Sequence, residues 1–335
     1  MEAHIAARNA LLNVLDAAPG ERIVVVCDDK QSEVGHAFAN GALDLSLWTR
    51  LVILDTSAVR KEIPGYLQEI FTSQKPDIFI NLLSGSSEET PFRIKVIKME
   101  TRRRIRLGHC PGVTLDMLTD GALALKSDEY KKMQIFSNNL ILVLSKAKSI
   151  HLTTPSGTDL TFSVEGRPFF TDTLLDWKDL KWMNLPVGEV IVAPLESSLE
   201  GTLVCDMAIG GVPIPNKPVT VECRGGKAIS VDSDEESVKI PIEKALATCP
   251  WSSVVGEFAF GVNPAARFVD EFLETEKMFG TCHIAFGNNE DFPEGRNPAD
   301  NHMDFLMDKP TVEVQYLGGE VRKVMQDGRY LDIPH

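Results

Sequence analysis

The first 148 residues alternate between short, almost continuously apolar segments and amphipathic segments with helical spacing. The apolar segments predict strands at residues 48–56 and 76–84, and a turn followed by a strand at residues 18–29. Helices are predicted at residues 6–15, 32–43, 63–73 and 91–105. Strands that are apolar on both faces and separated by helices form parallel sheets covered on both sides. The pattern therefore predicts an α/β domain at residues 1–148 with a parallel, Rossmann- or flavodoxin-like sheet.

The pattern changes after residue 148. Segments become alternating and β-branched, as in "IHLTTPSGTDLTFSV" (150–164) and "KPVTVECRGGKAISV" (217–231), with Gly-Gly turns at hairpin spacing. Helices are predicted only at about residues 237–248 and at residues 263–278. We therefore predict a second domain at residues 149–335, of α+β type and rich in antiparallel strands.

The charge of the chain limits its partners. Its 335 residues carry a formal net charge of −14, whereas binding to nucleic acid needs a basic face. The one basic run, at residues 98–106, is interpreted as a solvated helix face or as internal salt-bridge donors. We expect no nucleic-acid partner.

Cysteine spacing and hydropathy predict the compartment. The six cysteines are scattered without a CxxC pair, which is typical of reduced thiols. The N-terminal residues lack the basic and apolar regions of a signal peptide, and no apolar run reaches the roughly 18 residues of a membrane helix. We expect a cytoplasmic protein without membrane contact that acts on a small molecule or a short peptide.

Two glutamates of the second domain follow a glycine within apolar segments. They are Glu189 in "LPVGEVIVAP" and Glu257 in "SSVVGEFAFGVNP". Burying an ionised carboxylate without a partner costs several kcal/mol, so a buried glutamate is paired, protonated or bound to a metal. Each glutamate alone also fits an edge-strand residue that faces water.

Three further residues can bind a metal. His283 lies in the apolar "CHIAFG" and alone also fits a hydrogen-bonded core histidine. His302 and Asp304 are two residues apart on a predicted strand, so their side chains share a face and can reach one ion. Imidazole and carboxylate donors without thiolate suit Zn²⁺, Co²⁺, Mn²⁺ or Mg²⁺. Together with Glu189 and Glu257 they bring three negative charges, which two divalent ions balance better than one.

A series of motifs in the second half resembles the thermophilic or leucyl aminopeptidase family of metallopeptidases, the aminopeptidase T, aminopeptidase S and PepS types. The resemblance covers roughly residues 150–307, and the α/β first half is compatible with the family's N-terminal domain. The matching motifs, in order, are "SGTDLTF", "EGRP", "NLPVGEVIVAP", "EGTLVCD", "GEFAFGVNP", "GTCHIAFGNN" and "NHMDFLM".

The resemblance implies a homodimeric metallo-aminopeptidase with a dinuclear metal site. The implied ligands are Glu189, Glu257, His283, His302 and Asp304, with Glu189 and Glu257 also expected to be catalytic. Two divalent ions would polarise the scissile carbonyl of an N-terminal peptide bond or small amide and activate a water.

Residues around this site are candidates for further roles. Glu196 and Glu200 are candidates for proton transfer, and Asn288, Asn289 and Arg296 for substrate binding; each also fits an exposed loop residue. Longer family members carry a tyrosine seven residues after the first histidine, where this chain has Glu290. The segment between the two histidines is also short, so substrate choice is expected to depend on it.

Two other functions fit the same residues. The sequence is also similar to 2,5-dihydroxypyridine 5,6-dioxygenase, in which two histidines and one carboxylate hold a single Fe²⁺. His283, His302 and Asp304 would supply that triad here. Alternatively, the protein is a binding or accessory protein that retains the site for stability.

Overall fold

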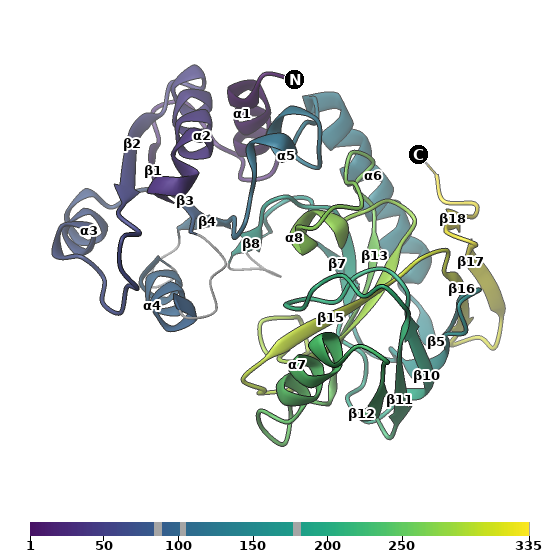
Figure 1. The fold of residues 1–335 in the computed structure, drawn as a ribbon. Coiled ribbons are helices and arrows are strands. Elements are labelled where there is room, and N and C mark those ends of the chain that lie inside the picture. Colours follow the sequence, from purple (N-terminus) through teal and green to yellow (C-terminus); the bar gives the residue numbers. More distant parts are fainter. Residues whose placement is uncertain (84–88, 101–104, 177–181, 335) are drawn as a thin grey trace. The chain divides into compact units, whose positions relative to one another are not determined.

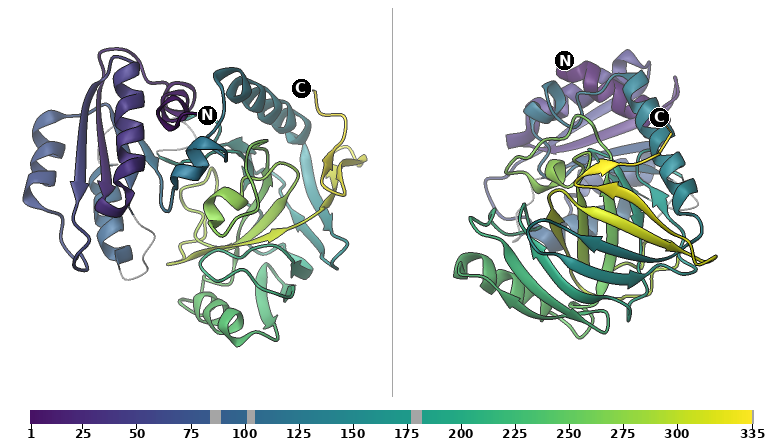
Figure 2. Two further views of the ribbon diagram at one scale, coloured as in Figure 1. Left: turned by 45° about the horizontal axis from the view of Figure 1, so that its top comes forward. Right: turned by 90° about the vertical axis from the view of Figure 1, so that its right-hand side faces the viewer.

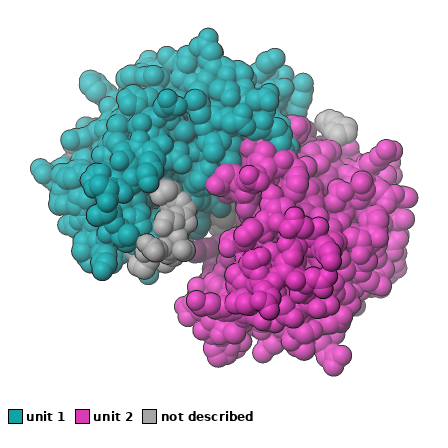
Figure 3. Space-filling model, viewed as in Figure 1, with its two compact units in different colours: residues 1–132, 172–187, 265–267 teal, residues 133–171, 188–264, 268–335 magenta. Residues whose placement is uncertain are grey.

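The chain forms two compact units, here called unit 1 and unit 2 (Figure 3). The computed structural model describes residues 1–83, 89–100, 105–176 and 182–334. Unit 1 contains residues 1–132, 172–187 and 265–267. Unit 2 contains residues 133–171, 188–264 and 268–335. Neither unit is continuous in sequence, whereas the prediction has one boundary after residue 148. The chain returns to unit 1 after residue 171 and adds a strand there.

Unit 1 is built on a parallel sheet of five strands in the order β2-β1-β3-β4-β8 (Figure 1). The strands are β1 (Arg22–Asp28), β2 (Trp48–Leu54), β3 (Ile78–Leu82), β4 (Arg106–His109) and β8 (Met183–Asn184). This is the strand order of flavodoxin-like sheets. The predicted parallel α/β fold of the first half is therefore confirmed.

Four helices of unit 1 lie close to the predicted positions: α1 (Ala3–Asn13), α2 (Ser32–Asp44), α3 (Gly65–Glu69) and α4 (Thr90–Glu100). No helix is predicted from the sequence at α5 (Leu115–Thr119) or at the first residues of α6 (Ser127–Leu144). A 3₁₀ turn (Asp29–Gln31) precedes α2, and a π-helical turn (Ile70–Gln74) continues α3. Residues 101–104, within the predicted helix 91–105 and the basic run, lie outside the described residues.

A buried acid lies beneath this sheet. Glu100 on α4 is fully buried, and its Oε2 accepts a hydrogen bond from Asn81 Nδ2 on β3 at 3.2 Å. Burial raises the pKa of Glu100 from 4.5 to about 8, against the smaller effect of the Asn81 hydrogen bond. At neutral pH the folded chain therefore keeps this carboxyl protonated, whereas the unfolded chain ionises it.

Glu100→Gln is expected to stabilise the protein at alkaline pH. Glu100 costs nothing below pH 4.5, and its cost grows as the pH rises towards 8, because only the unfolded state releases the proton. The glutamine is neutral at every pH. The free energy of unfolding of the variant should thus gain about 3 kcal/mol on the wild type between pH 5 and pH 8. Urea denaturation at both pH values measures this, and an equal difference at both would contradict it.

Unit 2 contains two antiparallel sheets. The larger has eight strands in the order β12-β11-β10-β6-β5-β16-β17-β18. Its strands are β5 (Ala147–Thr153), β6 (Asp159–Ser163), β10 (Glu200–Cys205), β11 (Val219–Arg224), β12 (Lys227–Asp232), β16 (Thr311–Tyr316), β17 (Val321–Gln326) and β18 (Arg329–Tyr330). Helix α6 packs beside its last strands, where the rings of Phe136 and Tyr330 are 4.8 Å apart (Figure 2).

The smaller sheet has five strands in the order β15-β14-β13-β9-β7. Its strands are β7 (Phe170–Thr171), β9 (Glu189–Val192), β13 (Val255–Gly261), β14 (Cys282–Gly287) and β15 (His302–Met307). Phe162 on β6 and Phe258 on β13 have ring centroids 5.0 Å apart, so the two sheets pack against each other. The predicted α+β second half rich in antiparallel strands is confirmed.

The predicted helix 263–278 is wrong over most of its length. The helices that unit 2 contains after α6 are α7 (Glu236–Leu246) and the short α8 (Phe272–Thr275), within the described residues. Asn263 donates its backbone N–H to Lys277 O at 2.9 Å. A helix over 263–278 would separate its ends by roughly 20 Å. The segment must instead form a loop that returns to β13.

The structure also bears on the cysteines and on membrane-spanning helices. All six cysteines lie in the described residues and are free thiols. None of the helices in the described part of the chain has the length and apolar character needed to cross a membrane.

Candidate metal centre

The smaller sheet of unit 2 brings the five predicted ligands together on one face. Glu189 lies on β9, Glu257 on β13, His283 on β14, and His302 and Asp304 on β15. Strand pairing places Gly261 opposite Glu189, Ala259 opposite His283, and Ala285 opposite both Glu257 and Asp304. Since residues two apart on a strand share a face, all five side chains project to the same side.

The opposite face of these strands is apolar. It carries Phe258, Phe260, Ile284, Phe286 and Phe305, all with no exposed surface. These side chains form the layer between the two sheets, as the contact of Phe258 with Phe162 shows. Alternation along each strand therefore separates a hydrophobic core face from a polar face, here called the ligand face.

Small residues occupy the positions between the ligands. Ala259, Gly261 and Ala285 lie on the ligand face, in the repeated pattern ligand–x–Ala–x–Gly of "EFAFG" and "HIAFG". A methyl group or a hydrogen atom leaves room between the donor atoms that a larger side chain would fill. At Gly261 even a Cβ atom would lie 2.0 Å from Met278 O.

The donor atoms form two overlapping groups. The His283 group contains Glu189, Glu257 and His283, and the His302 group contains Glu257, His302 and Asp304. In the first, His283 Nε2 lies 3.4 Å from both Glu189 Oε1 and Glu257 Oε1. In the second, His302 Nε2 lies 3.0 Å from Glu257 Oε2 and 3.2 Å from Asp304 Oδ1. Each oxygen of Glu257 thus belongs to a different group.

These spacings fit metal ligation. Ligands at about 2.0–2.1 Å around a tetrahedral ion are separated by about 3.3 Å, close to the donor distances in both groups. Neither ring nitrogen of His283 makes a hydrogen bond among the described residues, and Nε2 has only carboxylate oxygens at 3.4 Å, although the side chain is fully buried. A buried imidazole without hydrogen bonds is costly unless a metal takes one nitrogen. The residues present therefore fit divalent ions.

A backbone contact orients the second histidine. His302 Nδ1 lies 2.8 Å from the backbone oxygen of Asn288, which fixes the ring with Nε2 towards Glu257 and Asp304. Such a bond through the other nitrogen is typical of metal-binding histidines. Asn288, predicted as a substrate contact, thus holds His302 through its main chain.

The charges of the donor side chains depend on one another. Burial lowers the pKa of His283, but Glu257, Glu189 and Asp304 outweigh it and raise this pKa to about 9. Burial likewise opposes a raised pKa at His302, and Asp304 and Glu257 prevail. Burial raises the pKa of Glu257, whereas both histidines hold it well below its usual range. The imidazoles therefore carry protons that a bound metal must displace.

Sequence reasoning missed two charged residues at this site. Lys277 has 2% of its side chain exposed, and its Nζ contacts Glu189 Oε2 and, at 2.9 Å, Glu276 Oε1. Burial raises the pKa of Glu276, and the charge of Asp304 adds to this against the opposing effects of Lys277 and His283. Both residues fall in the wrongly predicted helix, where adjacent charges resemble a solvated face.

The other predicted site residues organise the loop between β14 and β15. Asn289 is buried; its Nδ2 donates to Gly256 O at 3.1 Å, and its Oδ1 accepts from Asn297 N at 2.7 Å. Arg296 donates its backbone N–H to Glu196 Oε1 at 3.0 Å, while its side chain is 76% exposed. Asn288 Nδ2 donates to Ala299 O at 2.9 Å.

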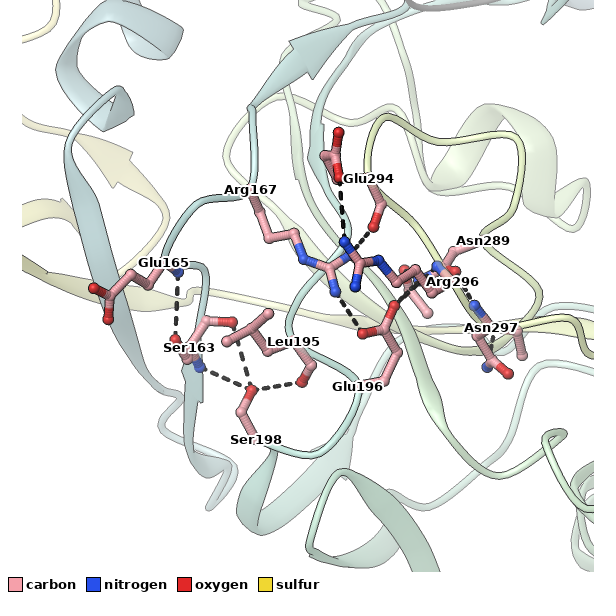
Figure 4. Close-up of polar contacts among 12 residues, drawn as sticks. Ser163, Glu165, Arg167, Leu195, Glu196, Ser198, Asn289, Glu294, Arg296 and Asn297 are labelled. Atoms are coloured by element: carbon pink, nitrogen blue, oxygen red, sulfur yellow. Dashed lines mark hydrogen bonds and ion pairs between the residues drawn. The ribbon is translucent and has the colours of Figure 1, made fainter.

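An arginine holds the proton-transfer candidate Glu196 (Figure 4). The guanidinium of Arg167 lies between the Glu196 carboxylate and the backbone oxygen of Glu294. Burial raises the pKa of Glu196, but Arg167 more than compensates and lowers it. A carboxylate held ionised in this way is a weak proton acceptor. Glu200, the other candidate, is exposed and accepts from Gly225 N at 2.7 Å.

The carboxylate and imidazole donors that the smaller sheet brings together are ligands that divalent metal ions prefer in proteins. Residues 128–330 match the family of thermophilic metalloproteases (M29). The chain therefore belongs to this family of metal-dependent peptidases, and the resemblance noted from the motifs is confirmed.

Two solved structures share the fold over nearly the whole chain. Wild-type AmpT from Thermus thermophilus is 16% identical, with a TM-score of 0.71 and coverage of 98% of this chain and 99% of its own. The 2,5-dihydroxypyridine dioxygenase from Pseudomonas putida KT2440 is 16% identical, with a TM-score of 0.70 and coverage of 98% and 97%. A comparison with curated proteins finds no match.

Proposed function

We propose that this protein is a metal-dependent aminopeptidase-like hydrolase that cleaves an N-terminal peptide bond or a small amide with two divalent ions. The observation that carries the proposal is the sharing of Glu257 between two donor groups, one with each histidine. Paired metals bridged by a carboxylate are an established hydrolytic arrangement. Membership of the M29 family supports the same reaction class.

Each ligand residue has a defined role in this proposal. When bound, divalent ions polarise a carbonyl and lower the pKa of a coordinated water to about 7. Glu257 would join the two donor groups, with Glu189 and His283 completing one and His302 and Asp304 the other. The free α-amine of the substrate would bind one of the ions or a nearby acidic group. Asn288 keeps His302 oriented through its backbone oxygen.

The second candidate is a ring-cleaving dioxygenase with one Fe²⁺ held by His283, His302 and Asp304. The shared fold with the Pseudomonas putida enzyme favours it. Against it, His283 Nε2 is 3.9 Å from Asp304 Oδ1 but 3.4 Å from both glutamates. The donor distances therefore support two carboxylate-rich groups over one triad.

Metal content and activity together test the proposal. We expect the protein, stripped of metal and reloaded with Co²⁺, Zn²⁺ or Mn²⁺, to hydrolyse amino-acyl anilides and to bind up to two ions per chain. A single tightly bound iron, with oxygen-dependent ring cleavage and no anilide hydrolysis, would establish the dioxygenase instead. Absence of turnover with every metal would leave the accessory role.

A further inference from the structure

Lys277 is a cation buried inside the ligand face. Its Nζ contacts Glu189 Oε2 and lies 2.9 Å from Glu276 Oε1, with 2% of the side chain exposed. A buried ammonium is tolerated only where anions compensate its lost hydration. Glu189 and Glu276 provide that compensation.

The main chain fixes this position. Lys277 O accepts from Asn263 N at 2.9 Å, and Lys277 N donates to Glu274 O at 3.1 Å. Val262, the residue before Asn263, donates to Gly188 O at 2.8 Å next to Glu189. The backbone of Lys277 is therefore held beside the ends of β9 and β13, within reach of Glu189.

The ammonium affects the two donor groups differently. Glu189 has one oxygen on Lys277 and the other 3.4 Å from His283 Nε2, so this carboxylate serves both a cation and the His283 group. In the His302 group, the ion pairs that Glu257 and Asp304 form among the described residues are with the two histidines alone. Within the described residues, the His283 group alone thus contains a ligand that pairs with a lysine.

We propose that Lys277 makes the two metal sites unequal. The His302 group binds its divalent ion tightly, and the His283 group binds its ion weakly. Two cations on one carboxylate repel each other, and this repulsion is strong where water is excluded. The inference rests on the proposed function only in requiring divalent ions at these donors. The second ion would then be exchangeable, and full activity would follow its concentration.

Lys277→Met tests the proposal, because methionine has a similar length without the charge. We expect the metal-free wild type to bind one Co²⁺ tightly and a second at least tenfold more weakly, measured by titration calorimetry and by elemental analysis after dialysis. In the variant, the second ion should bind roughly 10–100-fold more tightly, the range seen when groups around metal ligands change. The first affinity should change little.

Several outcomes would overturn the proposal. Equal affinities of the two ions in the wild type would show that the ammonium has no such effect. A weaker second ion in Lys277→Met would show that Lys277 merely orients Glu189. Absence of any Co²⁺ binding by the wild type would refute the metal centre itself, which is a different failure.

Thermal unfolding provides a second measurement that does not need the metal-free variant to be stable. Without Lys277, Glu189 and Glu276 lose the ammonium that contacts them both, so metal-free Lys277→Met should melt earlier. Co²⁺ should then raise its Tm more than that of the wild type, or restore folding if the variant is unfolded. Failure of Co²⁺ to do either counts against the proposal.

Arg60 in unit 1 offers a matched control. Its guanidinium also pairs with two buried carboxylates, Asp28 and Glu89, and lies 4.7 Å from the ring centre of Phe92. No metal-binding group is found among the described residues of that unit. Arg60→Met should lower Tm without any added gain from Co²⁺, whereas an equal gain in both variants would show a nonspecific effect and overturn the proposal.

Discussion

Glu257→Gln is expected to abolish binding of both divalent ions and to lower metal-dependent activity by about a thousandfold or more. Its Oε1 lies 3.4 Å from His283 Nε2, and its Oε2 lies 3.0 Å from His302 Nε2. An amide offers one neutral oxygen and a nitrogen that does not bind metals, so one group loses its shared ligand and the other keeps only an uncharged donor. Losing several kcal/mol of charge stabilisation in the transition state corresponds to such a decrease. Metal analysis after dialysis and kcat/KM on an amino-acyl anilide measure both effects.

Glu313→Gln is the control for this variant. Glu313 also neighbours a histidine, with its Oε2 3.8 Å from His151 Nδ1, but both side chains are about 40% exposed and lie on the larger sheet. Metal content and activity should be unchanged. Two ions retained by Glu257→Gln would show that Glu257 does not join the groups, and the two-ion proposal would have to be abandoned.

Ala259→Leu is expected to reduce metal affinity by about a hundredfold or more while every donor stays in place. Ala259 is fully buried on the ligand face, opposite His283 in one neighbouring strand and Ile191 in the other. Three additional carbon atoms would occupy the space between the donors. Overpacking of this kind lowers the free energy of unfolding by about 1–3 kcal/mol. The test therefore requires that the variant remains folded.

Phe258→Leu separates loss of space from loss of stability. Phe258 is the next residue and points into the layer between the sheets. The smaller side chain leaves a cavity and lowers the free energy of unfolding by a comparable amount. It should nevertheless retain both ions. Titration calorimetry with Co²⁺ measures the metal affinity of both variants. An equal loss of affinity in both would show that stability, and not the space between the donors, controls binding.

Part of the ligand set could be placed on one face from the sequence alone, because strand periodicity is local. His302 and Asp304 are two residues apart, so one strand is enough to align them. Glu189 and Glu257 required more, since their convergence depends on the pairing of β9 with β13 across 68 residues of chain. Periodicity does not predict this strand pairing. The order of the motifs indicated it, through the resemblance to the aminopeptidase family.

The region around Lys277 was not predictable in the same way. Residues 263–278 have the apolar spacing of an amphipathic helix, and local preferences favour that structure. Long-range bonds override it, because Asn263 pairs with Lys277 and Phe279 at the end of β13. A wrongly predicted helix places Lys277 on a solvated face, so its burial against Glu189 could not be inferred.

The loop between the histidines shows a similar limit. Its polar residues resemble substrate contacts in sequence, yet Asn289 is hydrogen-bonded to Gly256 and Asn297. Outside this loop, the proton-transfer candidate Glu196 is likewise paired with Arg167. Tertiary hydrogen bonds determine that Asn288 orients His302, whereas Asn289 stabilises the loop. These contacts have no periodicity that a single sequence could reveal.

The division of the smaller sheet into a core face and a ligand face restricts how this chain can evolve. Inserting one residue into β13 or β14 would exchange the faces, turning phenylalanines towards the ions and carboxylates into the core. Length changes in the connecting segments carry no such penalty, because they leave strand register intact. Descendants of this scaffold can therefore acquire new substrates through their loops while inheriting the donor set unchanged.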